Sequence, residues 1–477
     1  MYPDLFLAVD GKRIGADERA SMAVLNPATR RELGRLPLAE PADLQNAVAA
    51  ARRSLPLWSG LTAVERYEIL ARAAGLMKQR ARQIGEVLTL EQGKSLAEST
   101  REVTLSADII LFLAEEGKRL YGRTVPPRNA SILMQHVTRV PVGPVAAFTP
   151  WNFPVNLPAR KLGGALAAGC TTVIKPAEET PGSFLQVLSC LEEAGLPPGV
   201  VNAVFGNPAQ ISAQLLEAPE IHKVSFTGSV AVGQTIAAQA ARTLKRCTLE
   251  LGGHAPVIVC GDADVERVVR DLIPAKFRNA GQVCTAPTRF YVERSIHARF
   301  VDAFTAAAGA LRVGDGREEG VFMGPLAHER RVTAMQAMVD DARSHGARVT
   351  TGGRQLDREG YFFAPTVLVD TPDHAQVMRQ EPFGPIAVIS AFDTAEQAVA
   401  AANRLEFGLA AYLYTSDLAR AHDISARLEA GMVGVNHTGV SMPETPFQGV
   451  KNSGYGSESG SEGLLGYTDV KLVSFSR

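Results

Sequence analysis

Apolar residues recur at helical spacing through the first part of the chain. Thr62 and Glu65 form a capping-box pattern, and apolar residues then return every three or four positions from Ile69 to Met77. This pattern predicts a long amphipathic helix. After a short extended start, residues up to about 120 are expected to be mainly helical scaffold.

The pattern changes after this helical region. Residues 119–139 contain a Pro-Pro turn followed by an alternating tail, SILMQHVTR. Alternation beside a turn is typical of a β-hairpin, so we expect a hairpin that protrudes from the body of the protein.

Strand and helix patterns alternate in the region that follows. Residues 142–149 predict a strand, residues 157–168 a helix that Gly169 ends, and residues 171–175 a second strand. Further strands are expected in VVNAVFG, HKVSFTGS and RCTLELGG, with helices between them. This alternation predicts a parallel, doubly wound sheet with helices on both faces, which binds ligands at the carboxyl ends of its strands.

Length and composition narrow the class of protein. The chain has 477 residues, of which 46% are hydrophobic and 21% charged, as in a soluble globular protein with two or more domains. With 49 basic and 50 acidic residues it carries no charge excess that would attract nucleic acid or an anionic membrane. No stretch approaches the ~20 apolar residues of a membrane span and no secretory signal is found, so we expect a cytoplasmic protein. The five cysteines lack metal-ligand spacing, and we expect no metal site.

Polar residues follow several of the predicted strands. Asn152 lies in an apolar, proline-bounded turn, where its amide can serve an oxyanion or simply complete the turn. Lys175 and Glu178 can hold the two hydroxyls of a ribose, or can be solvated surface charges. Gly228 and Ser229 open a helix whose N–H groups suit a phosphate, although a glycine there also serves the backbone alone and no GxGxxG motif is present.

One thiol lies in a different setting from the other cysteines. Cys284 belongs to the run NAGQVCTAPTR, 34 positions after Glu250 in LELGG. A thiol among small and polar residues is typical of an exposed nucleophile, and a carboxylate beside two glycines can be its general base. The alternative is a cysteine that packs in the core.

Seven segments occur in a fixed order along the chain: FTPWNFP, KPAEETP, FTGS, LELGG, GQVC, EPFGP and PFQGVKNSGYG. Together they resemble the aldehyde dehydrogenase superfamily over nearly the whole length, and most of all its NAD(P)-dependent succinate-semialdehyde dehydrogenases. The resemblance implies an α/β fold of three parts and a homodimer or homotetramer. The parts are a Rossmann-like parallel-sheet cofactor domain (1–118 and 140–250), a second α/β catalytic domain (251–440), and an oligomerisation element made of a β-hairpin and a strand (119–139 and 458–477).

The resemblance assigns the chemistry to four residues. Cys284 matches the nucleophile, Glu250 the general base, Asn152 the oxyanion donor, and Lys161 a lysine that supports the base. It implies that the thiolate attacks an aldehyde, that hydride passes to nicotinamide, and that Glu250 activates water to hydrolyse the thioester. Relatives that transfer the acyl group to coenzyme A typically lack this glutamate, so a free carboxylic acid is expected. An inactive relative with a structural role is the alternative, which the set of Cys284, Glu250 and Asn152 disfavours.

The resemblance also implies a nicotinamide cofactor. Because the Glu178 carboxylate would repel a 2′-phosphate, NAD is expected as the preferred cofactor and NADP as the alternative, with Lys175 weakening the preference. The expected cofactor-binding residues are Pro150, Trp151, Asn152, Lys175, Glu178, Gly206, Phe226, Thr227, Gly228, Ser229, Leu251, Glu381 and Phe383.

Two arginines bear on the substrate. Arg160 and Arg278 match the pair that grips the carboxylate in succinate-semialdehyde dehydrogenases, a task that suits the planar fork of arginine. An acidic semialdehyde such as succinate semialdehyde is therefore expected. Glutarate semialdehyde, lactaldehyde, aminoaldehydes and apolar aldehydes are the alternatives. The other expected substrate-binding residues are Phe153, Ser441 and Phe447.

The chain departs from those relatives near both ends of the substrate. Ala286 stands where many have a second cysteine two positions after the nucleophile, so no disulfide switch is expected in this loop. Met442 stands where they have a serine, with Ser441 one position earlier, and PFQG replaces PFGG. The carboxylate end of the pocket is therefore expected to differ.

Overall fold

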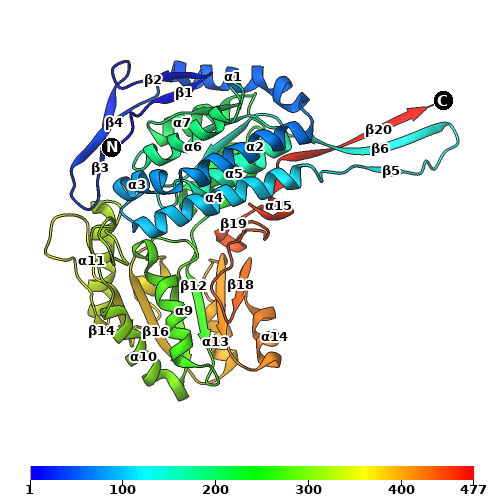
Figure 1. Ribbon diagram of the computed structural model, residues 1–477. Helices are drawn as coiled ribbons and strands as arrows, with labels where there is room; N and C mark the ends of the chain where they lie inside the picture. The colour runs from blue at the N-terminus through cyan, green and yellow to red at the C-terminus, as the bar shows by residue number, and fades with distance from the viewer. Residues whose placement is uncertain (1, 477) are drawn as a thin grey trace.

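The structure, a computed structural model that describes residues 2–476, contains two large sheets of mainly parallel strands (Figure 1). The expected α/β fold with a Rossmann-like parallel sheet is confirmed. The first residue of the expected range 1–118 and the last of 458–477 lie outside the described residues.

The first sheet has eight strands in the order β19-β11-β10-β7-β8-β9-β1-β2. Five parallel strands form its centre: β7 (Val145–Phe148), β8 (Thr172–Lys175), β9 (Val201–Ala203), β10 (Lys223–Thr227) and β11 (Arg246–Glu250). Antiparallel strands close its edges, with β19 (Gly454–Tyr455) at one and β1 (Leu7–Val9) and β2 (Lys12–Ile14) at the other. Strands β7 to β10 are buried throughout, as expected of a parallel sheet that is covered on both faces.

Eight helices accompany this sheet (Figure 1). They are α1 (Pro41–Gly60), α2 (Ala63–Gln79), α3 (Ala81–Gln92), α4 (Leu96–Gly117), α5 (Asn156–Ala168), α6 (Pro181–Glu193), α7 (Pro208–Glu217) and α8 (Val230–Ala241). The predicted amphipathic helix is α2, and its capping box is confirmed: the Thr62 hydroxyl accepts from the Glu65 N–H, and the Glu65 carboxylate accepts from the Thr62 N–H at 2.7 Å. Helix α4 packs on α2, α3 and α5, so the N-terminal helices cover α5 from outside.

The second sheet has seven strands in the order β14-β15-β16-β13-β12-β17-β18. They are β12 (Ala255–Val259), β13 (Pro287–Glu293), β14 (Arg348–Thr351), β15 (Thr366–Val369), β16 (Ile386–Phe392), β17 (Ala410–Tyr414) and β18 (Met432–Val435). Its helices are α9 (Val265–Phe277), the 3-10 turn η1 (Arg278–Gly281), α10 (Arg294–Gly309), α11 (Glu329–Ser344), α12 (Gln376–Arg379), α13 (Ala395–Asn403) and α14 (Leu418–Arg427). Only β14 runs antiparallel to its neighbour.

A third sheet projects from the body of the molecule (Figure 1). It consists of the predicted hairpin, β5 (Arg123–Val125) and β6 (Ile132–Pro141), with β20 (Thr468–Ser476) paired antiparallel along β6. Residues 458–467, the first part of the range expected to join this element, lie outside this sheet. They include α15 (Gly460–Leu465), which packs on α4 and α5. A separate two-stranded ribbon is formed by β3 (Ser21–Leu25) and β4 (Glu32–Pro37).

The parallel strands bring the predicted polar residues to one edge of the first sheet. Thr227 at the end of β10 is in register with Glu250 at the end of β11, and Phe148 of β7 is in register with Lys175 of β8. The turns that follow these strands are therefore neighbours, although they are far apart in the sequence. None of the helices that the structure describes is long and apolar enough to cross a bilayer.

The edge strand β19 approaches this site so closely that it requires a glycine. Gly454 pairs with Glu250, has φ of 111°, and would place a Cβ 1.9 Å from the Leu249 carbonyl oxygen. Gly346, at the end of α11, has φ of 90° but no atom within 4 Å of a built Cβ.

We expect Gly454→Ala to lower the melting temperature more than Gly346→Ala, measured by calorimetry. Both residues have a positive φ, so alanine is strained at either position. Gly454, with ψ of −166°, lies in a region that is essentially glycine-only, and its Cβ would also collide with a backbone oxygen. Equal decreases in the melting temperatures of the two variants would contradict this prediction. They would show that β19 can move away from Leu249 without a loss of stability.

Candidate active site

Cys284 lies in the loop between η1 and β13 and is half-buried. Burial, followed by the charges of Glu381 and Glu250, raises the pKa of its thiol to about 12, while Arg160 and Arg278 act in the opposite direction. The thiol is therefore protonated at neutral pH in this state, and a nucleophilic role requires that its proton be removed.

The Asn152 turn follows β7 and faces the cysteine loop. The Asn152 side-chain amide donates to the Gln282 carbonyl at 3.0 Å, which leaves its second N–H for another acceptor. The Asn152 carbonyl oxygen accepts from Lys94 Nζ at 2.7 Å and from the Asn279 amide at 2.9 Å. The turn is thus fixed from both sides.

A buried ion pair holds this turn in place. Lys94 and Glu102 are 2.5 Å apart, and their side chains are 0% and 2% exposed. Glu102 also accepts from the backbone N–H groups of Val155 and Asn156 at the start of α5. Buried charges of this kind are stable only when every donor and acceptor is matched. Neither residue stands out in the sequence, because charged side chains usually face solvent.

Glu250 at the end of β11 is a buried carboxylate without hydrogen-bond partners in the described part of the chain. It is 1% exposed, and neither of its oxygens accepts a hydrogen bond from any residue the structure describes. Burial and the charge of Glu458 raise its pKa well above the ordinary 4.5, opposed by Lys161 and Arg160. A carboxylate in this state is a stronger base than one in water.

Lys161, predicted to support Glu250, contacts a different carboxylate. Its Nζ is 2.5 Å from Glu458 and donates to the Ser225 hydroxyl at 3.0 Å. It acts on Glu250 through its charge alone. Glu458 was missed; the only signal in the sequence is a glutamate between serines in a glycine-rich segment.

Arg160 is fully enclosed, with partners from two distant segments. Its Nε donates to Asn156 at 3.0 Å, one terminal nitrogen to Ser459 at 2.5 Å, and the other to Ser441 at 2.7 Å. The guanidinium lies 4.8 Å from the centre of the Phe447 ring. Three of the residues predicted for the substrate, Arg160, Ser441 and Phe447, are therefore in contact.

Arg278 does not join this group. Its side chain is 41% exposed, lies 3.9 Å from Glu98, and stands 5.5 Å from the centre of the Phe153 ring. Its charge nevertheless acts on Cys284. The two arginines expected to act as a pair thus occupy different environments.

The predicted ribose-binding residues are already in contact with each other. Lys175 and Glu178 are 2.6 Å apart, and Glu178 Oε1 accepts from the Gly206 N–H at 3.0 Å, so that Oε2 remains available. The other predicted cofactor residues surround the same edge of the sheet. Pro150 and Trp151 precede Asn152; Phe226, Thr227, Gly228 and Ser229 end β10 and open α8; Leu251 follows Glu250.

Glu381 and Phe383 face these turns from the second sheet. Burial raises the pKa of Glu381 to about 8, although it accepts from the Gly253 N–H and is flanked by Arg331 and Lys276. The Phe383 ring packs edge-on against Trp151 at 5.6 Å. Residues from the second half of the chain therefore contact the turns at the strand ends of the first sheet.

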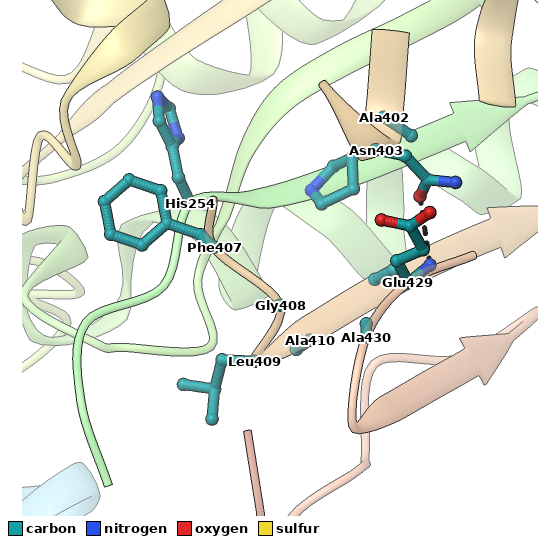
Figure 2. A pocket seen from close by; sticks show the side chains of 11 residues that line it. His254, Ala402, Asn403, Phe407, Gly408, Leu409, Ala410, Glu429 and Ala430 are labelled. Carbon is teal, nitrogen blue, oxygen red and sulfur yellow. Dashed lines mark hydrogen bonds between the residues drawn. The ribbon is translucent and has the colours of Figure 1, made fainter. Parts of the chain in front are cut away.

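Figure 2 shows a cavity in the second sheet that does not include Cys284. Its volume of about 10 Å³ has room for no more than about one water. His254 lines it beside Phe407. Burial, followed by the charge of Arg289, lowers the pKa of His254 well below 6.5. The neutral ring therefore donates through Nε2 to the Val377 carbonyl and accepts from the Thr288 hydroxyl at Nδ1. These bonds anchor the loop that follows Glu250.

Comparisons with known proteins agree with the geometry. The family model described as "Aldehyde dehydrogenase family" matches residues 14–473. The 4-(hydroxymethyl)benzenesulfonate dehydrogenase of Comamonas testosteroni is 50% identical over 454 residues, 95% of this chain and 94% of the relative. The NADP(+) succinate-semialdehyde dehydrogenase of Escherichia coli is 42% identical over 465 residues, 98% and 96% of the two chains. A solved succinate-semialdehyde dehydrogenase from Burkholderia pseudomallei has a TM-score of 0.97 at 41% identity, covering 99% of this chain and 98% of its own.

The raised pKa of Glu250 predicts a pH-dependent effect of Glu250→Gln on stability. Because the folded protein holds this proton more tightly than the unfolded chain, the stability contributed by protonated Glu250 is lost as pH rises above 4.5 through the raised value. Glutamine removes this loss. We expect the variant to melt above wild type at about pH 8 and by a smaller margin at about pH 5, measured by calorimetry. A margin independent of pH would contradict the raised pKa.

Proposed function

The chain belongs to the aldehyde dehydrogenase family, and from that premise we propose that it oxidises an anionic aldehyde, with succinate semialdehyde as the first candidate, to a free carboxylic acid. The observation that carries this proposal is the position of Arg160. Its buried positive charge acts on both Cys284 and Glu250, and Ser441 and Phe447 lie against it. A cation beside a nucleophile and a base suits a substrate with a negative charge at its far end.

The proposed chemistry assigns one task to each group. Cys284, once deprotonated, attacks the aldehyde carbon, and the free N–H of Asn152 stabilises the alkoxide together with the Cys284 backbone N–H. Bound nicotinamide cofactor supplies the hydride acceptor. Glu250 then takes a proton from a water molecule, and the resulting hydroxide attacks the thioester carbon. The carboxylic acid leaves, and the Cys284 sulfur regains a proton. Lys161 and Glu458 set the charge around that base.

Buried oxygens without partners support a cofactor site at the strand ends. Thr149 follows β7, and Thr227 is the last residue of β10. Among the described residues, neither hydroxyl forms a hydrogen bond, and Glu381 Oε1 forms none either. Glu178 Oε2 fits a ribose hydroxyl, and the N-terminus of α8 behind Ser229 suits a pyrophosphate. NAD is proposed as the preferred cofactor.

A sulfonated aromatic aldehyde is the second candidate substrate. Two hydroxyls, those of Ser441 and Ser459, flank the Arg160 guanidinium, and a sulfonate has three oxygens for such donors where a carboxylate has two. The Comamonas relative, 50% identical, is named for a benzenesulfonate.

We also propose that the projecting sheet joins two copies of the chain. Leu133, Val470 and Leu472 on this sheet are 57% to 63% exposed, which is unusual for apolar side chains on a long edge. A cytoplasmic location stays a prediction.

Steady-state assays with NAD on five aldehydes test the proposed function. The panel is succinate semialdehyde, glutarate semialdehyde, lactaldehyde, 4-formylbenzenesulfonate and hexanal. We expect the highest kcat/KM for an anionic member and background NADH formation from Cys284→Ser. Arg160→Ala should raise KM for that substrate by about 30-fold or more, as loss of a buried charge partner costs about 2–5 kcal/mol. Because Arg278 is exposed, we expect Arg278→Ala to raise KM for that substrate by a smaller factor. Equal effects on hexanal would mean that the arginines are structural.

Glu178→Ala tests the cofactor preference. A hydrogen bond to a charged group contributes about 1.5–3 kcal/mol, so we expect the ratio of kcat/KM for NAD to that for NADP to fall about tenfold or more. Glu179→Ala is the matched control, because Glu179 faces Arg330 instead of Lys175. An NADP preference in the wild type, as in the name of the Escherichia coli relative, would overturn the proposal.

A further inference from the structure

We propose that Ser459 is a positioning residue that holds the Arg160 guanidinium in the orientation needed to bind an anionic aldehyde, and thereby sets the preference for such substrates. This inference rests on the proposed function of the same site. Ser459 lies in the range 458–477, which is predicted to belong to the oligomerisation element.

Two neighbouring residues of α5 are matched by two neighbouring residues of the C-terminal segment. Arg160 donates to Ser459 at 2.5 Å, and Lys161 pairs with Glu458 at 2.5 Å. The backbone of Glu458 is bonded in both directions to that of Phe447, at 2.7 and 2.8 Å. The segment is therefore held in register on the helix, and Ser459 is fixed on the arginine.

The backbone of Ser459 is strained. Its φ of 57° and ψ of −179° lie in a region that is populated almost only by glycine. The residue is 1% exposed, so its hydroxyl gains nothing from water. It does not cap α15, whose first turn it precedes. Despite this strained backbone, the position holds a serine. Within the described structure, the Ser459 hydroxyl has one polar contact, the Arg160 guanidinium.

The contact determines which N–H groups of Arg160 remain for a ligand. A guanidinium has five N–H donors, and Asn156, Ser441 and Ser459 each accept one. One N–H is left on each terminal nitrogen, the pair that a carboxylate or sulfonate can meet. Without the Ser459 hydroxyl a buried donor loses its partner, and the guanidinium is free to turn toward another acceptor.

The test compares Ser459→Ala, which keeps the strain, with Ser459→Gly, which removes it. We expect both variants to raise KM for succinate semialdehyde about tenfold, the effect of losing a hydrogen bond to a charged group, with a change in kcat and in the KM of hexanal below about twofold. Ser459→Gly should melt above Ser459→Ala. Ser457→Ala is the matched control, since Ser457 is two residues away and its hydroxyl donates to Gln448. It should resemble wild type.

A second measurement does not depend on turnover. Succinate should slow alkylation of Cys284 by iodoacetamide, followed by mass spectrometry of the Cys284 peptide, in wild type but not in the Ser459 variants. If wild type oxidises hexanal as well as any anionic aldehyde, the proposed function fails, and loss of protection in the Ser459 variants still supports the role of Ser459. If both Ser459 variants keep wild-type KM and protection, or if Ser459→Gly changes KM equally in an Arg160→Ala background, the inference is overturned.

Discussion

Two adjacent positive charges inside one buried helix constrain the rest of this structure. All thirteen residues of α5 are buried, including Arg160 and Lys161. Charges removed from water must be paired, and most of their partners come from residues 441–459, beyond the second sheet. The C-terminal segment is therefore tied to the first sheet. The same pairing brings Glu458 near Glu250 and leaves Arg160 facing the cysteine loop.

The acidic groups near α5 are all poorly solvated. Burial raises the pKa values of Cys284, Glu250 and Glu381, and each negative charge raises those of its neighbours. A positive charge placed among these three groups would lower all of their pKa values at once. Ionisation of Cys284 is thus favoured only while a cationic group is bound beside it, which limits the exposure of a reactive thiolate to solvent.

Local pattern was sufficient to predict the scaffold and much of the site. Helix α2, the parallel strands and the hairpin follow from periodicity and turn residues, and the strand-end residues from the geometry of parallel sheets. The roles assigned to Cys284, Glu250 and Asn152 depend on a family resemblance and stay predictions, although the structure brings the three residues close together.

Residues that act through distant contacts could not be found in the sequence. Lys94 and Glu102 look like surface charges until α4 is packed on α5, and Ser459 looks like a turn residue until it meets Arg160. Arg278 stays a prediction of the same kind, because no signal in the sequence indicates that it would be exposed beside Glu98 while Arg160 is buried. Tertiary packing decides these cases, and it has no local signature.

The order of synthesis gives the pairing of α5 with the C-terminal segment a further meaning. Ser459 follows Arg160 by 299 residues, which a ribosome adds in roughly 15–60 seconds. Throughout that interval the two cations of α5 lack their partners from residues 441–459, so the packing around this central helix of the first sheet is incomplete. Although its strands are translated early, the interior of this sheet is completed by some of the last residues to emerge. A truncated chain would therefore lose the packing of its first half along with its C-terminal strand.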